Sequence, residues 1–344
     1  KFKDMNYMNN FAGGYILPLV CDYLEAQGFQ CISLDHYNSH ASSENSFLIT
    51  DISSKRKSFR LAGLIPLVAY SLESPIYAYK YYSNVSKYVE NYKLLVDWSG
   101  VKSCYPNLKT SFIAMKWPCD LKILQFSSPP KPNTIQRAHK VVFISSNKQP
   151  FSYEPPNKIS FQFLKYQLGF CQMKFLQSTK RMLSCSLYHH KVSLIEKLLQ
   201  HNFLDVYGKN WQTNFLYSAY RESFKGVIAN KFDALIYYKF ALCTENARFE
   251  GYITEKIYDA LFSYTIPVYM GDLEIAKTIP SNCFIDVNNF NCFDDLVHYL
   301  STMEDDLYYQ YIENIQQFVR NFPRLGFTCE DFAKIICSEV ANYQ

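Results

Sequence analysis

The sequence has no apolar stretch approaching the roughly 18 residues that a membrane-spanning helix needs, and no long run of like charge. Neither a helical membrane protein nor a charged nucleic-acid-binding tail is therefore predicted. The 344 residues carry 35 basic and 31 acidic side chains, for a net charge of +4. This mildly basic balance suits an anionic small ligand as well as it suits nucleic acid, although no nucleic-acid partner is expected. Peripheral association with a membrane is left open.

The sequence also has no C-x-x-C pair among its eleven cysteines, which argues against a zinc ribbon. Their odd number and scattered positions are typical of buried small apolar residues rather than of a disulfide framework. The cysteines thus favour a reducing compartment. The N-terminal segment "KFKDMNYMNN" does not resemble a signal peptide.

The chain alternates helical and strand-length apolar patterns, with only 11 glycines in all. Before a proline-rich linker at 126–133, helical spacing occurs at 16–28 and 77–90, and strand-length runs occur at 29–35, 46–52, 65–72 and 92–98. After the linker, strands are expected at 140–146, 203–208, 237–244 and 266–270, and helices at 187–200, 226–236 and 254–262. Segment 148–186 fits neither period and is interpreted as an insertion. The alternation predicts two α/β domains with parallel sheets, 1–137 and 138–344.

One stretch, "ENARFEGYITEKIYDA" (245–260), places a carboxylate and an ammonium side by side where a helix begins. Helix starts that follow parallel strands face the ligand edge of the sheet, and their free N–H groups favour an anion. Lys256 would bind a diphosphate, and Glu255 would accept hydrogen bonds from ribose hydroxyls. A nucleotide diphosphate sugar would satisfy both residues. The alternative is that Glu255 only complements the helix dipole.

The longer stretch "YKFALCTENARFEGYITEKIYDALFSYTIPVYMG" (238–271) resembles the signature of the α1,3/4-fucosyltransferase family, which are inverting enzymes that use GDP-fucose. The shared pattern is a Y-K-F strand, E-N, Y-[IV]-T-E-K, a helix and [IV]-P-V/I-x-x-G. "VVFISSNK" (141–148) and "LYHHKVSLIEKL" (187–198) resemble bacterial-type members.

This resemblance implies a GT-B architecture, in which two Rossmann-like domains face each other across a cleft, the first binding the acceptor and the second GDP-fucose. It implies donor-binding roles for Asn246, Tyr252, Glu255 and Lys256. Lys191 stands where the family has a phosphate-binding arginine, and it keeps the charge without the bidentate fork. Further donor-site candidates are Glu245, in the E-N pair, and Lys225 and Lys231, where bacterial-type members carry basic residues.

The acceptor hydroxyl needs a general base. Glu73, in "SLESP" after an apolar strand, matches the context of the family's catalytic glutamate. Asp35, His36 and Asp97, also near strand ends, are the rival bases. No side-chain group has convincing metal-ligand spacing, so we expect catalysis without an obligatory metal or other cofactor.

The expected activity is transfer of L-fucose from GDP-fucose to a glycan hydroxyl, such as O3 of an N-acetylglucosamine in an N-acetyllactosamine-like acceptor. Two alternatives remain open: a non-catalytic nucleotide-sugar or glycan-binding module, and a transferase for another guanine-nucleotide sugar. The expected location is a bacterial or viral cytoplasm, or the Golgi lumen if an N-terminal anchor was removed.

Overall fold

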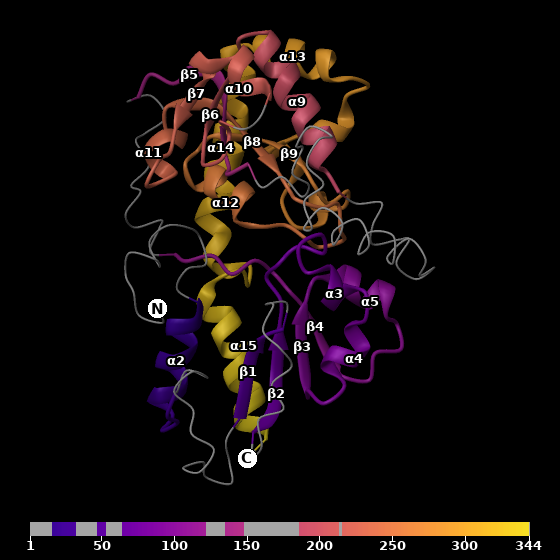
Figure 1. Cartoon of the computed structure of the whole chain (residues 1–344). Helices are drawn as coiled ribbons and strands as arrows, with labels where there is room; N and C mark the ends of the chain where they lie inside the picture. The colour runs from indigo at the N-terminus through magenta and orange to yellow at the C-terminus, as the bar shows by residue number, and fades with distance from the viewer. Residues whose placement is uncertain are drawn as a thin grey trace, which may run out of the picture. The chain divides into compact units, whose positions relative to one another are not determined.

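The computed structural model describes residues 16–31, 47–52, 64–121, 135–147, 186–212 and 215–343 (Figure 1). They belong to two compact units, each of which combines helices with a parallel sheet. Unit 1 comprises Lys1–Leu121, Phe249–Tyr252 and Pro323–Gln344, and unit 2 comprises Lys122–Arg248 and Ile253–Phe322. The C-terminal segment therefore groups with the N-terminal one, and a boundary placed at residues 137 and 138 falls inside unit 2.

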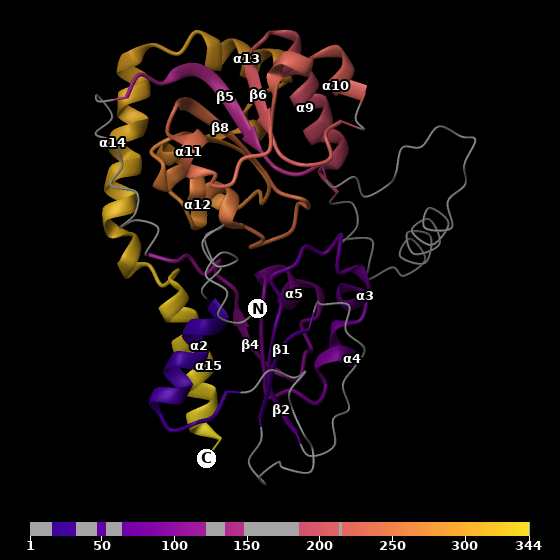
Figure 2. The ribbon, with the colours of Figure 1, turned by 60° about the vertical axis from the view of Figure 1, so that its left-hand side comes forward.

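Unit 1 is built on a four-stranded sheet of order β1-β2-β3-β4, in which every described pairing is parallel. The strands are β1 (Phe47–Asp51), β2 (Ile65–Tyr70), β3 (Leu94–Asp97) and β4 (Ser111–Ala114), and the helices are α2 (Ile16–Ala26), α3 (Tyr79–Tyr82), α4 (Val85–Val89), α5 (Ser99–Cys104) and α15 (Cys329–Asn342). Helices α2 and α15 pack together on one side of the sheet, and α3 to α5 lie on the other (Figures 1 and 2). Strand β3 is buried along its whole length and forms the centre of this core.

Two features of unit 1 differ from the sequence prediction. The helix expected over 77–90 is divided into α3 and α4, because Asn84 has φ −155° and interrupts the helical backbone before α4. Strand β4 was not predicted, because its residues are mostly exposed and lack the apolar pattern of a buried strand. The run expected at 29–35 lies largely outside the described residues.

Residues Phe249–Tyr252, although distant in sequence, form part of unit 1. The N–H of Gly100 donates to the carbonyl of Glu250 at 3.0 Å, and a Cβ at Gly100 would lie 2.8 Å from the Phe249 ring. Tyr252 packs edge-on against Trp98, with ring centroids 5.1 Å apart. Because Gly100 has no side chain, the segment Phe249–Tyr252 can pack closely against the start of α5.

Unit 2 is built on a six-stranded sheet of order β10-β9-β8-β5-β6-β7, again parallel at every described pairing. Its strands are β5 (Ala138–Ile144), β6 (Leu204–Tyr207), β7 (Phe224–Gly226), β8 (Tyr238–Thr244), β9 (Ile266–Met270) and β10 (Ile285–Asp286). Its α-helices are α9 (Tyr188–Gln200), α10 (Phe215–Ala219), α11 (Phe232–Leu235), α12 (Glu255–Phe262), α13 (Phe293–Ser301) and α14 (Asp305–Asn321). Short 3₁₀ turns lie at Arg221–Ser223, Ile275–Lys277, Ser281–Cys283 and Val287–Asn289, and another, Phe322–Arg324, joins the two units.

The core of unit 2 lies around β5, β8 and β9, and β9 is buried at every residue. Helix α12 packs on β8 and β9, and α9 packs on β6 and α13. The expected strands at 140–146, 203–208, 237–244 and 266–270 are all present, as are the helices at 187–200 and 254–262. Two α/β units with parallel sheets, predicted from this alternation, are therefore confirmed.

The prediction of a helix over 226–236 was wrong. Its first residue ends strand β7, and only Phe232–Leu235 is helical. Gly226 has φ +87°, a left-handed conformation that ends the strand, and the Asn230 side chain accepts a hydrogen bond from the Phe232 N–H at 3.1 Å to start the short helix. The linker at 126–133 lies outside the described residues, as does the insertion at 148–186 except for its last residue. Within the described ranges, no helix is long and apolar enough to cross a membrane.

Candidate functional site

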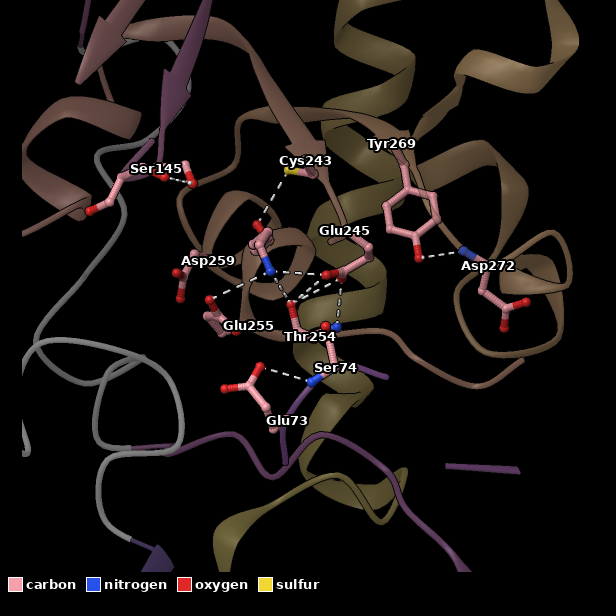
Figure 3. Close-up of polar contacts among 12 residues, drawn as sticks. Glu73, Ser74, Ser145, Cys243, Glu245, Thr254, Glu255, Asp259, Tyr269 and Asp272 are labelled. Carbon is pink, nitrogen blue, oxygen red and sulfur yellow. Dashed lines mark hydrogen bonds and ion pairs between the residues drawn. The ribbon is translucent and has the colours of Figure 1, made fainter. Parts of the chain in front are cut away.

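The carboxyl end of β8 leads directly into the motif that the sequence singled out. Glu245 follows β8, its carboxylate is fully buried, and its N–H still donates to the Met270 carbonyl of β9 at 2.9 Å. One Glu245 oxygen accepts the Thr254 N–H at 2.8 Å, and both oxygens lie within 3.0 Å of the Thr254 hydroxyl (Figure 3). Thr254 is the N-cap residue that precedes α12, so Glu245 fixes the start of this helix to the end of the strand.

Lys256, in the first turn of α12, completes this contact. Its Nζ donates to a Glu245 oxygen at 2.9 Å and to the Thr254 hydroxyl at 2.7 Å. Glu255 lies beside it, with Oε1 at 3.8 Å from the Lys256 Nζ and 3.9 Å from the Lys231 Nζ. Burial tends to raise the pKa of Glu255, but the two ammonium groups outweigh it and lower the pKa below its ordinary value. Glu255 is therefore an ionised carboxylate between two cations.

Lys231 approaches the start of α12 from the loop before α11. Its Nζ donates to Asp259 at 2.8 Å. Burial acts to lower its pKa, but Asp259 and Glu255 outweigh that effect and raise it, so the ammonium stays charged. Asp259 is 2% exposed, and its Oδ1 has no hydrogen-bond partner among the described residues. We call Lys231, Glu245, Thr254, Glu255, Lys256 and Asp259 the Glu245 cluster.

The Glu245 cluster borders a small hollow of about 20 Å³ between the helices and the sheet. Lys231, Lys256 and Asp259 line one side, and residues of β5 and β8 line the other. This volume is about that of one water molecule. The two ammonium groups on its wall make the edge of the hollow positively charged, so an anionic group could bind there.

The glycine of the family pattern has a packing role beside the cluster. A Cβ at Gly271 would lie 2.2 Å from the Tyr269 hydroxyl and 2.8 Å from Cγ of Glu245. The Tyr269 hydroxyl in turn accepts the Asp272 N–H at 3.0 Å (Figure 3). Gly271 thus allows the chain after β9 to pass close to the buried carboxylate.

Asn246 and Lys191 lie at a neighbouring position on the same edge of the sheet. The Asn246 carbonyl accepts the Leu187 N–H at 3.3 Å, just before helix α9, which carries Lys191. Lys191 is 6% exposed, and its Nζ lies 5.2 Å from the centre of the Tyr188 ring. The Tyr188 hydroxyl donates to Asn147, which follows β5, at 3.3 Å. Strands β5 and β8 are parallel neighbours, so Asn147 and Asn246 both follow carboxyl ends at that edge.

Two other donor-site candidates lie elsewhere. Lys225, in β7, donates to the Glu222 carbonyl at 2.8 Å and lies 3.7 Å from Asp205 of β6. Tyr252 belongs to unit 1, where it is 2% exposed against Trp98. Both residues make structural contacts, and their donor-binding roles stay predictions. Sequence reasoning missed Asp259, although an aspartate four residues after Glu255 falls on the same helix face.

The candidate base, Glu73, follows β2 in unit 1 and is half-buried. Its Oε1 accepts the Ser74 N–H at 2.8 Å (Figure 3). The rival Asp97, at the end of β3, is fully buried and accepts three hydrogen bonds, from the Tyr81 hydroxyl at 2.5 Å, the Trp98 N–H at 2.7 Å and the Tyr82 hydroxyl at 3.0 Å. Its burial makes it unsuited to meet a substrate. The other rivals, Asp35 and His36, lie outside the described residues.

The described part of the chain contains no group of three or more His, Cys, Asp or Glu side chains that could hold a metal ion. The nine cysteines in it form no disulfide, and five of them are buried.

The part of the chain that contains the Glu245 cluster is similar to known proteins. Residues 174–338, just under half of the chain, match "Glycosyltransferase family 10 (fucosyltransferase) C-term". The chain is 45% identical over 73 residues to the alpha-(1,3)-fucosyltransferase FucT of Helicobacter pylori, covering 21% of this chain and 15% of that protein. It is 34% identical over 110 residues to 4-galactosyl-N-acetylglucosaminide 3-alpha-L-fucosyltransferase 9 of Mus musculus, covering 31% and 30%. The chain thus spans less than a third of the length of either relative.

A solved structure, "Crystal Structure of alpha1,3-Fucosyltransferase with GDP-fucose", aligns with 84% of this chain and 79% of its own, at a TM-score of 0.37 and 18% identity. Because that structural similarity is low, the assignment rests on the sequence matches. They agree with the resemblance found in the motif 238–271, which is confirmed. Residues 174–338 of the chain therefore match the C-terminal domain of glycosyltransferase family 10, the fucosyltransferases.

Proposed function

We propose that this chain is an inverting fucosyltransferase that moves L-fucose from GDP-fucose to a glycan hydroxyl, with O3 of an N-acetylglucosamine as the acceptor position. The observation that carries the proposal is the Glu245 cluster. It presents two ammonium groups and an ionised carboxylate at a helix start, within the part of the chain that matches the fucosyltransferase family. Unit 2 would bind the donor and unit 1 the acceptor, as the two domains of a GT-B enzyme.

The donor has an anionic diphosphate and neutral ribose hydroxyls, and the Glu245 cluster offers ammonium groups for the first and a carboxylate for the second. Lys256 and Lys231 would neutralise the diphosphate, aided by the N–H groups at the start of α12. Glu255, held ionised, would accept hydrogen bonds from the ribose hydroxyls. Asn246 and Lys191, at the neighbouring position on the same sheet edge, would contact the remaining part of the nucleotide sugar. Glu245 would hold Lys256 and Thr254 in place rather than contact the donor itself.

The transfer is a single displacement. The acceptor oxygen forms a bond to C1 of fucose as the bond from C1 to the β-phosphate oxygen breaks, and GDP leaves with the electron pair. Attack from the face opposite the leaving group inverts C1. The proton of the acceptor hydroxyl passes to the Glu73 carboxylate, because a neutral hydroxyl is a weak nucleophile. The negative charge that develops on GDP is stabilised by the cluster's ammonium groups, with no metal required.

The test is incubation of the purified protein with GDP-fucose and N-acetyllactosamine, with GDP release and the fucosylated product both measured. We expect turnover in the presence of EDTA. The variant Glu73→Gln should lose at least 100-fold in turnover, since general-base catalysis contributes about 10²- to 10⁴-fold, while GDP-fucose affinity stays within twofold. Near-normal turnover of this variant would exclude Glu73 as the base, and activity that EDTA abolishes and manganese restores would exclude the metal-free step.

One observation favours the second candidate, a nucleotide-sugar or glycan-binding module without turnover. Lys191 replaces the family's arginine, and a lysine lacks the planar fork that grips a phosphate. Tight GDP-fucose binding without GDP release, across a broad panel of acceptors, would support the module. Transfer from another guanine-nucleotide sugar in the same assay would instead indicate a different donor sugar.

For the location of the activity we propose a reducing compartment, the cytoplasm of a bacterial or viral system. The odd number and scattered positions of the eleven cysteines support this proposal.

A further inference from the structure

Asp97 is a buried acid for which the proposed reaction has no direct use. It ends β3, is 0% exposed, and lies within the electrostatic influence of the Asp51 carboxylate of β1. A carboxyl group at such a position costs stability unless its oxygens are hydrogen-bonded. Three donors supply those bonds: the hydroxyls of Tyr81 and Tyr82 from α3 and the N–H of Trp98. Two of the residues that supply these donors, Tyr82 and Trp98, also contact the main-chain carbonyl of Glu73.

The first connection runs through the Tyr82 hydroxyl. This oxygen lies 3.0 Å from Oδ1 of Asp97, 2.9 Å from the carbonyl of Glu73 and 3.0 Å from the Ser71 hydroxyl. The single proton of this hydroxyl is shared between the Asp97 carboxyl group and the Glu73 carbonyl, so Tyr82 joins the buried acid to the main chain of the candidate base. Tyr82 is itself 1% exposed, so its ring cannot move away without disturbing the core.

The second connection runs through Trp98. Asp97 accepts the main-chain N–H of Trp98 at 2.7 Å, and the indole N–H of Trp98 points back to the Glu73 carbonyl at 3.4 Å. The indole is fully buried and stacks on Trp117, with interplanar angle 1° and centroids 6.3 Å apart. The Glu73 carbonyl is therefore approached by two donors, and Asp97 contacts the residue that supplies each one.

From these contacts we infer that Asp97 is a positioning residue for fucose transfer, which holds the main chain at Glu73 through Tyr82 and Trp98 and so sets the direction of the Glu73 carboxylate. The inference rests on the proposed role of Glu73. A base must stay within hydrogen-bond reach of the proton that it takes, and a displacement of about 1 Å can cost on the order of 10²-fold in rate. Glu73 follows a strand on a short loop, so its geometry depends on such anchors.

The test compares Asp97→Asn with the parent, with Glu73→Gln and with the double variant. Asparagine keeps the volume of the side chain but replaces one acceptor oxygen with a donor, so the three bonds cannot all form. We expect kcat for fucose transfer to fall at least tenfold, with the KM for GDP-fucose unchanged. In the Glu73→Gln background the same substitution should cost less than twofold, because a residue that acts through Glu73 has nothing left to position.

Two more variants separate positioning from stability. Tyr82→Phe keeps the ring and removes only the hydroxyl, and it should lower kcat in the same way. Thr110→Val is the matched control, because Thr110 is 7% exposed and donates one buried hydrogen bond to the Val89 carbonyl at 2.9 Å. This control should leave kcat within twofold of the parent.

A second readout does not depend on activity. The N–H of Ser74 is bonded to the Glu73 side chain, so its hydrogen exchange reports the order of that loop. Exchange at Ser74 should increase at least fivefold in Asp97→Asn and Tyr82→Phe but not in Thr110→Val. Unchanged exchange, or a loss of kcat that is as large with Gln at position 73 as with Glu, would overturn the inference. Absence of transfer by the parent would instead overturn the proposed function, and the exchange measurement would still decide the role of Asp97.

Discussion

At the scale of single residues, Lys256 is the side chain on which the donor proposal most depends. Its ammonium contacts Glu245, Thr254 and Glu255, so its position is fixed before any ligand arrives. A cation that is already oriented loses little conformational entropy on binding. The structure thus shows how the Lys256 side chain is oriented, which its position in the sequence does not reveal.

Replacing Lys256 with alanine should lower the affinity for GDP by about 10- to 100-fold, since a charge-assisted contact contributes roughly 1.5–3 kcal/mol. Isothermal titration calorimetry measures this affinity directly. The matched control is Lys277→Ala, which removes the same charge from a side chain that is 72% exposed and paired with Glu274. We expect the control to bind GDP like the parent, and an equal affinity in both variants would remove Lys256 from the site.

At the scale of elements, the turns after β5 and β6 depend on one close backbone approach. Gly208 follows β6 with φ +142°, and a Cβ there would lie 2.1 Å from the Ser145 carbonyl oxygen. That oxygen also accepts the Trp211 indole N–H at 2.8 Å. Because the obstruction would be backbone, it cannot be relieved by a change of rotamer. The approach orders the carboxyl end of β5, which lies on the ligand edge of the sheet.

Gly208→Ala and Gly226→Ala form a matched pair of substitutions. Gly226 also has positive φ, at +87°, but a Cβ there would meet nothing within 4 Å. We expect Gly226→Ala to lower the free energy of unfolding by about 1–3 kcal/mol, the usual cost of a strained backbone conformation. Gly208→Ala should cost more, because the steric overlap is added to that strain. Urea unfolding followed by circular dichroism measures both, and equal losses would show that the chain relaxes around position 208.

At the scale of the whole molecule, each unit carries an acidic side chain with a shifted pKa, and the stability contributions of the two change with pH in opposite directions. In unit 1, burial raises the pKa of Asp97 from its ordinary 3.8 to about 7. The native state therefore holds a proton that the unfolded state has released, and stability falls as pH rises from about 4 to 7. In unit 2, Lys256 and Lys231 outweigh burial and lower the pKa of Glu255. Its contribution is present above its ordinary 4.5 and is lost on acidification.

Asp97→Asn should remove the first of these dependences. A pKa shift from 3.8 to about 7 corresponds to about 4 kcal/mol. The lost hydrogen bonds lower the stability of the variant at pH 4, but its difference from the parent should shift in favour of the variant by up to that amount as pH rises from 4 to 8. Tryptophan fluorescence in urea at several pH values measures it, because Trp98 and Trp117 lie beside Asp97 in unit 1. Stability curves that stay parallel across this range would contradict the assigned pKa.

The sequence by itself determined the elements whose pattern is unambiguous. Strands β8 and β9 and helix α12 have the apolar spacing of buried elements, and the E-K pair falls at the start of that helix. The sequence motif 238–271 also showed the resemblance to fucosyltransferases, because its residues can be compared with the family signature position by position. Strands β4 and β7 were missed, because exposed edge strands carry little hydrophobic signal.

Only the tertiary structure decided which distant residues share a site. Lys231 and Asp259 are 28 positions apart, and the ion pair exists because α12 and the loop before α11 pack near the same edge of the sheet. Residues Phe249–Tyr252 and Pro323–Gln344 join unit 1 although they follow most of unit 2 in the chain. From its position at a strand end, the sequence suggested Asp97 as a rival base. Its burial and its hydrogen bonds from Tyr81 and Tyr82 instead led to the positioning role that we infer for it. Such outcomes depend on long-range packing, which no local spacing of residues encodes.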